Sequence, residues 1–325
     1  MSSAPNIVAL GAGRMGRGIA QVFAYAGYDI TILDFKERAL EDSKALLAAA
    51  KDEIKENLEF LVSLDVLAAT KISRILSRIH GAPIDEAAQI LNDADYIFEG
   101  VPEILGIKKD TIKRVSAMTS GDAVIASTTS TMLVTQLAEF STHPENFLNA
   151  HFLNPAYIIP LVEVSPSDKT DPKKLEKFVE LLESIGKTPV VCKASPGYII
   201  PRFQSLIMNE AARMVEEGIA SAEDIDRAVR TGFGVRYATM GPIEFADWGG
   251  VDILHYASAY LSEHLGTRFK APEIIGEMMG KGHLGINHGK GFHNFENMDI
   301  DAYKREKLST FIALLTHLNL MPKKG

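Results

Sequence analysis

A glycine-rich motif that directly follows an apolar run constrains the fold of this chain more than any other feature. Residues 7–10 (I-V-A-L) have the composition of a buried parallel strand, and G-A-G-R-M-G follows them at residues 11–16. Apolar residues then recur at helical spacing between residues 19 and 26, and residues 28–33 have the composition of a second strand. This order predicts a Rossmann domain, an α/β fold around a mostly parallel sheet.

The three glycines of the motif and the acid after the second strand also predict the cofactor. Gly11 permits the tight turn, Gly13 lets a pyrophosphate approach the backbone, and Gly16 lets the helix pack against the sheet. The helix N-terminus faces the phosphates. Asp34 follows 18 residues after Gly16, where its carboxylate binds the ribose hydroxyls and repels a 2′-phosphate. We therefore expect NAD rather than NADP, although Lys36 weakens that preference slightly.

Composition and charge limit the class of protein. The chain has 325 residues, enough for about two domains, and its net charge is −8. This charge and the lack of a long basic run disfavour nucleic acid and anionic membranes as partners. Residues 1–6 lack the features of a signal peptide, no apolar run approaches the about 18 residues of a membrane span, and Cys192 is the single cysteine. We expect a cytoplasmic protein that binds no membrane.

Helical and strand patterns predict two domains that meet near Lys193. Residues 1–193 form the Rossmann domain, and residues 194–325 form an all-α domain. A helix pair at about 35–80 projects from the sheet, because its first helix (35–63) is too long for a crossover helix. Further strands are expected at 96–101, 124–126 and 188–192, and further helices at 67–79, 173–185, 203–217, 221–232, 242–265, 274–280 and 303–318.

Residues 149–164 (N-A-H-F-L-N-P-A-Y-I-I-P-L-V-E-V) contain a histidine and a carboxylate in apolar, strand-like sequence. Pro155 and Pro160 exclude one continuous helix. An extended segment, a turn near Pro155 and a return strand would bring His151 and Glu163 together. A carboxylate next to an imidazole fixes the ring tautomer, and the ring then acts as a general base near neutral pH. The alternative is a buried histidine and a strand-edge glutamate without chemistry.

Polar residues also gather where ligands of an open parallel sheet bind, at the C-terminal ends of its strands. The run S-T-T-S-T at 127–131 follows one strand, and its hydroxyl groups either donate to a ligand or cap the next helix. Glu103 and Lys108 follow the preceding strand. They contact cofactor or substrate if they face the site, and they are otherwise ordinary surface charges.

Three histidines, His283, His288 and His293, lie in the glycine-rich segment 280–295. Their five-residue spacing does not place them on one helix face, and no cysteine or acid cluster accompanies them. We therefore predict no metal site and interpret this segment as a mobile loop near the cofactor.

Together these motifs resemble the L-3-hydroxyacyl-CoA dehydrogenase family over nearly the full length of the chain. The resemblance is carried by G-A-G-R-M-G at 11–16, Asp34, E-G-V-P-E ending at Glu103, A-S-T-T-S at 126–130, H-F-L-N-P from His151, L-V-E-V around Glu163, S-P-G-Y from Ser195, and M-G-P-I-E-F-A-D at 240–247.

The resemblance implies an architecture and roles for individual residues. It implies a C-terminal domain that forms a homodimer, an active site between the two domains, and a projecting helix pair that shelters a CoA tail. His151 would be the catalytic base and Glu163 its partner, with Ser130 and Asn154 next to the reacting carbon and the nicotinamide. The residues that it assigns to NAD are Gly11, Gly13, Met15, Gly16, Asp34, Glu103, Lys108, Ser130 and Asn154.

Two positions depart from the family pattern, since Thr128 and Pro201 stand where the family usually has asparagine. The second asparagine contacts the substrate region, so Pro201 alters that region. Proline lacks an N–H, and we expect a helix to begin around it. The N-P-A-Y-I-I-P-L-V-E pattern and Arg236-Tyr237 resemble a branch with L-gulonate 3-dehydrogenase, lambda-crystallin and carnitine dehydrogenase, which uses 3-hydroxy acids without CoA. Arg236 either pairs a free carboxylate bidentately or is a surface arginine.

We expect an NAD-dependent dehydrogenase that reversibly oxidises a small-molecule substrate, an L-3-hydroxyacyl-CoA, to the 3-ketoacyl-CoA. A free 3-hydroxy acid of the L-gulonate or carnitine type is the alternative substrate. A 6-phosphogluconate or 3-hydroxyisobutyrate-type dehydrogenase fits less well, because it needs a catalytic lysine after a glycine-rich motif, and Lys193 is followed by A-S-P-G. A non-catalytic, crystallin-like nucleotide-binding protein would need neither His151 nor Glu163.

Overall fold

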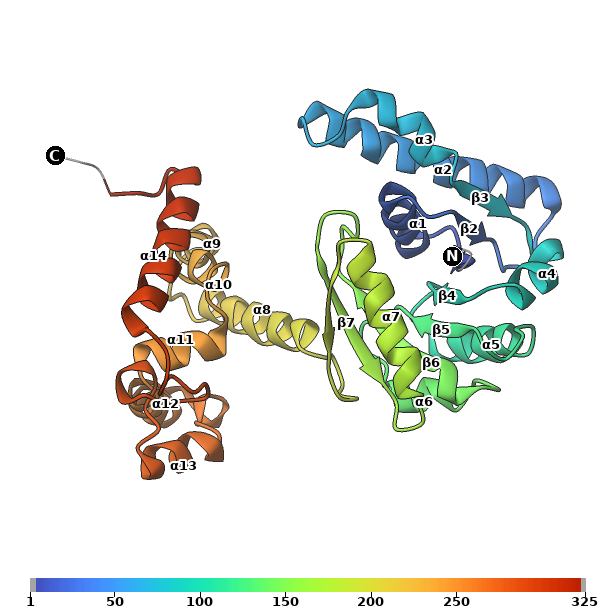
Figure 1. Cartoon of the computed structure of the whole chain (residues 1–325). Helices are drawn as coiled ribbons and strands as arrows, with labels where there is room; N and C mark the ends of the chain where they lie inside the picture. The colour runs from blue at the N-terminus through green and yellow to red at the C-terminus, as the bar shows by residue number, and fades with distance from the viewer. Residues whose placement is uncertain (1–3, 323–325) are drawn as a thin grey trace. The chain divides into compact units, whose positions relative to one another are not determined.

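The structure is a computed structural model that describes residues 4–322 (Figure 1). The chain divides into two compact units between Ile207 and Met208. The first unit is α/β and the second is all-α, so the predicted fold class is confirmed.

An eight-stranded sheet organises the first unit. Its order, β3-β2-β1-β4-β5-β6-β7-β8, places β1 between β2 and β4, the reversal of strand order that dinucleotide-binding sheets share. Strands β1 to β6 are parallel, β7 runs antiparallel to β6, and β8 is parallel to β7. The strands are β1 Ile7–Leu10, β2 Ile30–Leu33, β3 Ile79–Ala82, β4 Tyr96–Glu99, β5 Val124–Ser127, β6 Phe147–Phe152, β7 Leu161–Pro166 and β8 Thr188–Val191.

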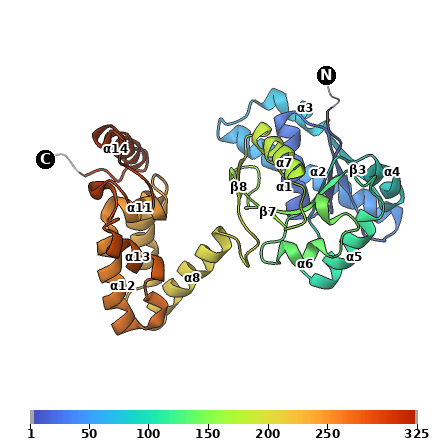
Figure 2. The same cartoon turned by 60° about the horizontal axis from the view of Figure 1, so that its bottom comes forward.

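Helices cover both faces of this sheet (Figures 1 and 2). Alternate residues of β1 belong to different apolar clusters, as strand geometry requires: Ile7 and Ala9 pack with α1, α2, α3 and α7, and Val8 and Leu10 pack with α4, α5 and α6. The helices are α1 Arg14–Ala26, α2 Leu40–Ser63, α3 Ile72–Leu76, α4 Ala87–Asn92, α5 Leu105–Ser116, α6 Val134–Ala138 and α7 Pro172–Ser184.

The start of the long helix α2 differs from the prediction, since it begins at Leu40 rather than at residue 35. Phe35 is buried in the core, and Arg38 reaches back to Asp34 with its Nε 2.8 Å from Oδ2. These two side chains hold residues 34–39 against the sheet, so the helix starts only beyond them.

The prediction of a second long helix at 67–79 was wrong at its C-terminal end. Helix α3 ends at Leu76, and Ile79–Ala82 forms the edge strand β3, which the sequence did not reveal. A Cβ on Gly81 would lie only 3.1 Å from the Cβ of Leu47, so this glycine allows α2 to cross the strand closely. A four-residue strand that contains glycine carries too little alternation to be recognised.

The second unit is helical, and α8 leads into it from the first. Ser221 caps α9, because its hydroxyl accepts from the N–H of Asp224. The single helix expected at 242–265 is instead two helices, since Gly250 adopts a φ of 106° between them. The α-helices are α8 Ile200–Glu216, α9 Ala222–Ala228, α10 Val235–Tyr237, α11 Pro242–Gly249, α12 Val251–Leu265, α13 Glu273–Lys281 and α14 Ile300–His317, with a π-helical turn at Val229–Gly234.

Candidate active site in the first unit

His151 and Glu163 form the centre of the candidate site. They face each other directly in the antiparallel register of β6 and β7, on the two strands that flank the proline-containing turn. The Nδ1 of His151 lies 2.8 Å from the Oε2 of Glu163, and both residues are buried. The predicted pairing is therefore present. Because the Nδ1–H of His151 donates a hydrogen bond to the carboxylate of Glu163, Nε2 is the nitrogen that remains as an acceptor.

The second oxygen of Glu163 holds the start of helix α8. Its Oε1 accepts hydrogen bonds of 2.8 Å from the backbone N–H groups of Ile199 and Ile200. Pro201 is the second residue of that helix, where a missing N–H costs nothing, so the expectation that a helix begins around it is confirmed. Glu163 thus uses one oxygen for the imidazole and the other for the helix terminus.

Tyr198 is a member of the site that sequence reasoning missed, although it is the last residue of S-P-G-Y. Its ring stacks on the imidazole of His151 with centroids 5.3 Å apart and an interplanar angle of 11°. Its hydroxyl donates to the carbonyl of Thr129 (3.0 Å) and accepts from the amide of Asn149 (2.9 Å). The pKa of Tyr198 is raised, mainly because the residue is buried. The phenol therefore stays protonated, and the ring that stacks on His151 is uncharged.

Lys108 and Glu99 form a buried ion pair at the C-terminal end of β4. The side chain of Lys108 is 1% exposed, and its Nζ lies 2.9 Å from both carboxylate oxygens of Glu99. Lys108 is therefore not an ordinary surface charge. Glu99, which the sequence analysis did not single out, also accepts from Ser127 (2.6 Å) and from the N–H of Val101 (2.8 Å). This pair connects β4 to the start of α5 and to the end of β5.

Glu103 organises the run of hydroxyl residues after β5. Its Oε1 accepts from the hydroxyls of Thr129 (2.5 Å) and Thr131 (3.1 Å) and from the N–H of Ser130 (3.1 Å). Burial raises the pKa of Glu103, but these hydrogen bonds and the ammonium of Lys108 outweigh it and hold the pKa below the ordinary value. Residues of the hydroxyl run therefore donate hydrogen bonds to Glu103, a role that was not predicted from the sequence.

This hydrogen bonding makes stability depend on the charge of Glu103. A lowered folded-state pKa means that the carboxylate stabilises the fold fully above the ordinary value of 4.5, and that this stabilisation is lost as pH falls through the folded pKa. We expect Glu103→Gln to lower the free energy of unfolding at pH 7 by about 1 kcal/mol, a small effect because solvent screens a side chain of which 40% is exposed. Urea unfolding at pH 7 and pH 3 measures it, and the difference between variant and wild type is smaller at the lower pH.

The matched control is Glu183→Gln, because Glu183 is exposed and makes no ion pair with another residue of the range 4–322. It leaves the free energy of unfolding unchanged at both pH values. A gap between wild type and Glu103→Gln that is as large at pH 3 as at pH 7 contradicts the assigned role of the charge.

Ser130 and Asn154 present their side chains to solvent. Both residues are exposed, and neither the Ser130 hydroxyl nor the Asn154 carboxamide makes a hydrogen bond with another described residue. Asn154 lies on the β6–β7 turn at a cis peptide bond with Pro155. Polar groups that have no partner among the described residues are available to a ligand.

The glycine loop has the geometry that a dinucleotide needs. Gly11 adopts a φ of 89°, and its N–H donates to the carbonyl of Leu33 (2.8 Å). A Cβ on Gly16 would lie 1.9 Å from the carbonyl oxygen of Gly11, so α1 approaches the loop as closely as glycine allows. A Cβ on Gly13 would meet no protein atom within 4 Å, and α1 begins there without a side-chain cap or an acidic residue in its first turn. The helix N-terminus is thus open to an anion.

Met15 and Asp34 flank this loop. Met15, in the first turn of α1, is partly buried and packs against the apolar cluster on the sheet face that α1, α2, α3 and α7 cover. Asp34 is buried, and its Oδ2 receives both the hydroxyl of Ser43 (2.7 Å) and the guanidinium of Arg38 (2.8 Å). Its Oδ1 makes no hydrogen bond with a residue of the range 4–322.

Substitution by alanine, which adds one methyl group, is expected to have different effects at Gly13 and at Gly16. We expect Gly16→Ala to lower the thermal stability of the unliganded protein, by about 1–3 kcal/mol as for other overpacked sites, and to weaken NADH binding as well. Gly13→Ala leaves stability unchanged and weakens only NADH binding, because its Cβ occupies the space that a pyrophosphate approaches. Thermal unfolding and NADH fluorescence titration separate the two effects. Equal stability losses in both variants would contradict this geometry.

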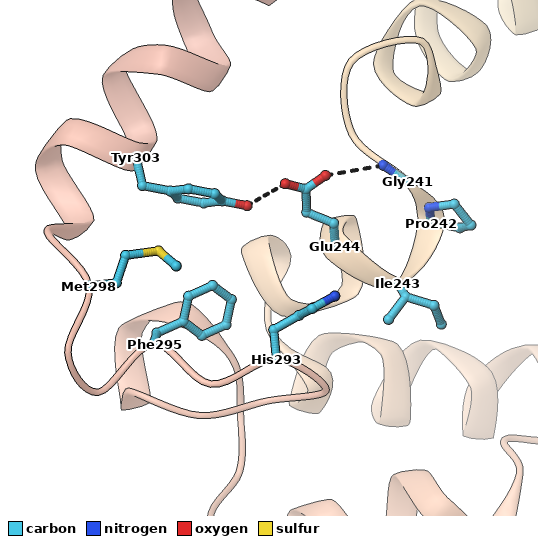
Figure 3. A pocket seen from close by; sticks show the side chains of 8 residues that line it. All are labelled: Gly241, Pro242, Ile243, Glu244, His293, Phe295, Met298 and Tyr303. Carbon is cyan, nitrogen blue, oxygen red and sulfur yellow. Dashed lines mark hydrogen bonds between the residues drawn. The ribbon is translucent and has the colours of Figure 1, made fainter. Parts of the chain in front are cut away.

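A pocket of about 470 Å³ lies in the second unit, between the start of α11, the segment before α14 and α14 itself (Figure 3). Glu244 accepts from the hydroxyl of Tyr303 and from the N–H of Gly241 (Figure 3). It also forms an ion pair with Lys307. The lining residues are Gly241, Pro242, Ile243, Glu244, His293, Phe295, Met298 and Tyr303.

Asp247 ties the glycine-rich segment 280–295 to α11. Its buried carboxylate accepts from the N–H groups of Phe292 (2.7 Å) and His293 (2.8 Å) and from the Nδ1 of His293 (2.7 Å). Cβ atoms on Gly285 or Gly291 would lie about 2 Å from Asp247. Within residues 4–322 no group of three or more metal-binding side chains comes together. His293 thus belongs to a structural carboxylate–imidazole pair.

Arg236 lies on α10 with its guanidinium 4.5 Å from the ring centroid of Phe245. It forms no ion pair with any carboxylate of residues 4–322. A half-buried guanidinium that stacks on an aromatic ring without a counter-ion retains its bidentate donors for a ligand.

Family models match the chain in two parts, which meet at residues 195–197, before the boundary between the two compact units. Residues 6–195 match the family model described as 3-hydroxyacyl-CoA dehydrogenase, NAD binding domain, and residues 197–295 match the C-terminal domain of the same family. No helix within residues 4–322 combines the length and the apolar character that crossing a membrane requires.

Relatives with different names cover nearly the whole chain. A probable 3-hydroxybutyryl-CoA dehydrogenase of Deinococcus radiodurans is 31% identical over 287 residues, which are 88% of this chain and 98% of that protein. The 5-formyl-3-hydroxy-2-methylpyridine 4-carboxylate 5-dehydrogenase of Mesorhizobium japonicum is 29% identical over 310 residues, 95% and 96% of the two chains. The crystal structure of a 3-hydroxyacyl-CoA dehydrogenase from Archaeoglobus fulgidus, 32% identical, superposes with a TM-score of 0.77 over 98% of this chain and 100% of that one. The chain therefore belongs to the 3-hydroxyacyl-CoA dehydrogenase family, whose NAD-binding domain forms its first unit.

Proposed function

We propose that this protein oxidises an L-3-hydroxyacyl-CoA to the 3-ketoacyl-CoA with NAD, reversibly, and that His151 is the general base. The observation that carries the proposal is the buried pair of His151 and Glu163, 2.8 Å apart on adjacent strands. Family membership supplies the reaction class, and the pair supplies a group that can remove the hydroxyl proton.

The residues of the glycine loop fit the cofactor. The uncapped start of α1 and the open space at Gly13 accept the pyrophosphate, and the free Oδ1 of Asp34 accepts a ribose hydroxyl. NAD, when bound, supplies the acceptor for the hydride that leaves the substrate carbon. Met15, Glu103 and Lys108 act indirectly in this proposal: they pack under the loop or hold the hydroxyl run in place.

Different side chains of the site accept the proton of the substrate hydroxyl and bind the substrate oxygen. The Nε2 of His151 takes the proton of the substrate hydroxyl, and Glu163 stabilises the resulting imidazolium through Nδ1. Ser130 and Asn154, whose polar groups have no partner among the described residues, hold the substrate oxygen and the cofactor amide. In the reverse direction the protonated His151 donates to the ketone.

A free 3-hydroxy acid remains the second candidate substrate, and Arg236 is the observation that favours it. Its guanidinium has no carboxylate partner among residues 4–322 and is the kind of group that binds a carboxylate through two hydrogen bonds. The relative from Mesorhizobium japonicum is named for a pyridine carboxylate, which shows that family members differ in substrate.

The test is NAD reduction by the purified protein with 3-hydroxybutyryl-CoA, longer 3-hydroxyacyl-CoAs, L-gulonate and carnitine. Higher kcat/KM on a CoA thioester supports the first choice. Preference for a free acid transfers the assignment to the second, and Arg236→Lys then distinguishes bidentate binding from simple charge. Absence of turnover on every compound, together with retained NADH binding, would support a crystallin-like protein instead.

We also propose a cytoplasmic homodimer with the second unit as its interface, and no nucleic-acid or membrane partner. Large apolar side chains are exposed on one face of α12, namely Ile253, Tyr256 and Tyr260, each more than 60% exposed in the single chain. Exposed apolar faces of this kind are typical of protein–protein contacts. Sedimentation of the purified protein gives the oligomeric state directly.

A further inference from the structure

Lys187 is a buried cation without a carboxylate partner. It lies in the turn before β8, is 9% exposed, and makes no ion pair with any described residue. Its Nζ donates to the carbonyl oxygens of Ala156 and Ile159, the second at 2.8 Å. Burial lowers the pKa of Lys187. A buried ammonium is costly unless its donors are satisfied, and here two backbone carbonyls accept from two of its three N–H donors.

Both carbonyls belong to the loop 153–160, which joins the two strands of the candidate site. The loop begins one residue after the end of β6, two residues beyond His151, and it carries Asn154. It ends where β7 begins, two residues before Glu163. Few backbone hydrogen bonds lie within the loop: the N–H groups of Ile158 and Ile159 both share the carbonyl of Pro155. The loop therefore depends on bonds from outside for its conformation.

Two further contacts show what the loop connects. The N–H of Thr188, next to Lys187, donates to the carbonyl of Pro160 (2.9 Å). On the other side, a Cβ on Gly18 would lie only 3.0 Å from the Cβ of Ala156, so the loop packs directly on helix α1. The loop thus lies between the helix that faces the cofactor phosphates and the strands that carry the imidazole and its partner.

We propose that Lys187 is a positioning residue for the dehydrogenase reaction: it fixes loop 153–160 and thereby sets the place of Asn154 relative to His151. This role rests on the proposed function. Lys187 touches neither reacting atoms nor His151, so it acts only through the loop. Small displacements of a positioning group reduce the rate of the chemical step more than they reduce binding.

The test compares wild type, Lys187→Met and Lys187→Gln in the full-length chain, with Lys174→Met as the matched control. Lys174 also donates to a backbone carbonyl, that of Asp122, but it does so from α7 and away from the loop. Steady-state kinetics with NAD and 3-hydroxybutyryl-CoA give kcat and both KM values. Hydrogen-exchange mass spectrometry of the loop peptide gives a second readout that needs no turnover.

We expect Lys187→Met to lower kcat by up to about 10²-fold while both KM values change by less than about threefold. The amides of Ile158 and Ile159 exchange faster in the variant, and those of β1 do not. Lys174→Met lowers thermal stability without changing kcat or loop exchange. If Lys187→Met does not fold, Lys187→Gln, which keeps donor groups on a shorter chain, is measured in its place.

Two outcomes would overturn the proposal. Loop exchange that stays as slow as in wild type means that Lys187 does not hold the loop. Faster loop exchange with an unchanged kcat means that the loop is held but does not position the reaction. If the wild type turns over none of the substrates, the proposed function fails by itself, and the exchange result still decides whether Lys187 anchors the loop.

Discussion

His151→Ala is expected to lower kcat for 3-hydroxyacyl-CoA oxidation by about 10²- to 10⁴-fold, the usual contribution of a general base. Its imidazole is paired with Glu163 and has Nε2 as its remaining acceptor, so its removal leaves no group of the pair that can accept the hydroxyl proton. Steady-state NAD reduction at saturating substrate measures the loss. NADH affinity, measured by fluorescence titration, stays within about twofold, because the glycine loop and Asp34 lie on other strands of the sheet.

His143→Ala is the matched control for this variant. His143 also lies next to a glutamate, with its Nδ1 3.3 Å from Glu145, but that pair is exposed and precedes β6 rather than lying in it. It therefore leaves kcat unchanged. Turnover by His151→Ala at more than about a tenth of the wild-type rate would assign the base to another residue.

Local sequence was sufficient to predict the elements whose signals lie close together in the chain. The strand, glycine loop and helix at residues 7–26 follow from adjacent residues, and the structure contains them. The pairing of His151 and Glu163 was predictable for a related reason. The prolines between them exclude a helix, and a tight return leaves two strands in antiparallel register.

Partners that are far apart in sequence could not be predicted in the same way. Glu163 bonds to N–H groups 36 and 37 residues away, and Tyr198 bonds to a carbonyl 69 residues away. In the sequence Glu99 is simply the last residue of an apolar strand. Only the fold shows that Lys108 is buried against it. Each of these groups is polar, buried and satisfied only through tertiary contacts, so no local pattern reveals its role.

Glycines explain two of the element boundaries that were wrong. Gly250 divides the expected helix at 242–265 through its positive φ, and Gly81 allows a short edge strand beneath α2. In the sequence both positions lie within runs that suit a helix or a loop. The close approach that requires a glycine is a property of the neighbour, Leu47 in the second case, and is visible only in the fold.

Two substitutions of Glu163 are expected to separate its two tasks, because each oxygen has a different partner. In Glu163→Gln the amide oxygen remains the better acceptor for the N–H groups of Ile199 and Ile200, so the amide NH₂ faces the imidazole. The NH₂ then donates to Nδ1 of His151 and forces the proton onto Nε2, the wrong tautomer for a base. We expect kcat to fall by about 10⁴-fold, the effect of the corresponding acid-to-amide change in the serine-protease triad.

Glu163→Ala is expected to reduce activity less, and stability more, than Glu163→Gln does. The imidazole of His151 is then free to adopt either tautomer, so kcat falls less than in the glutamine variant. The N–H groups at the start of α8, however, lose their acceptor at a partly buried position, which costs up to about 1–3 kcal/mol for each unsatisfied group. Unfolding and kinetics measured on both variants therefore give opposite rankings, with glutamine the less active and alanine the less stable.

Glu145→Gln, which alters the exposed pair with His143, changes neither quantity. A single ranking for activity and stability would mean that Glu163 serves only one of its partners, and the bond between its Oε2 and His151 would then be structural.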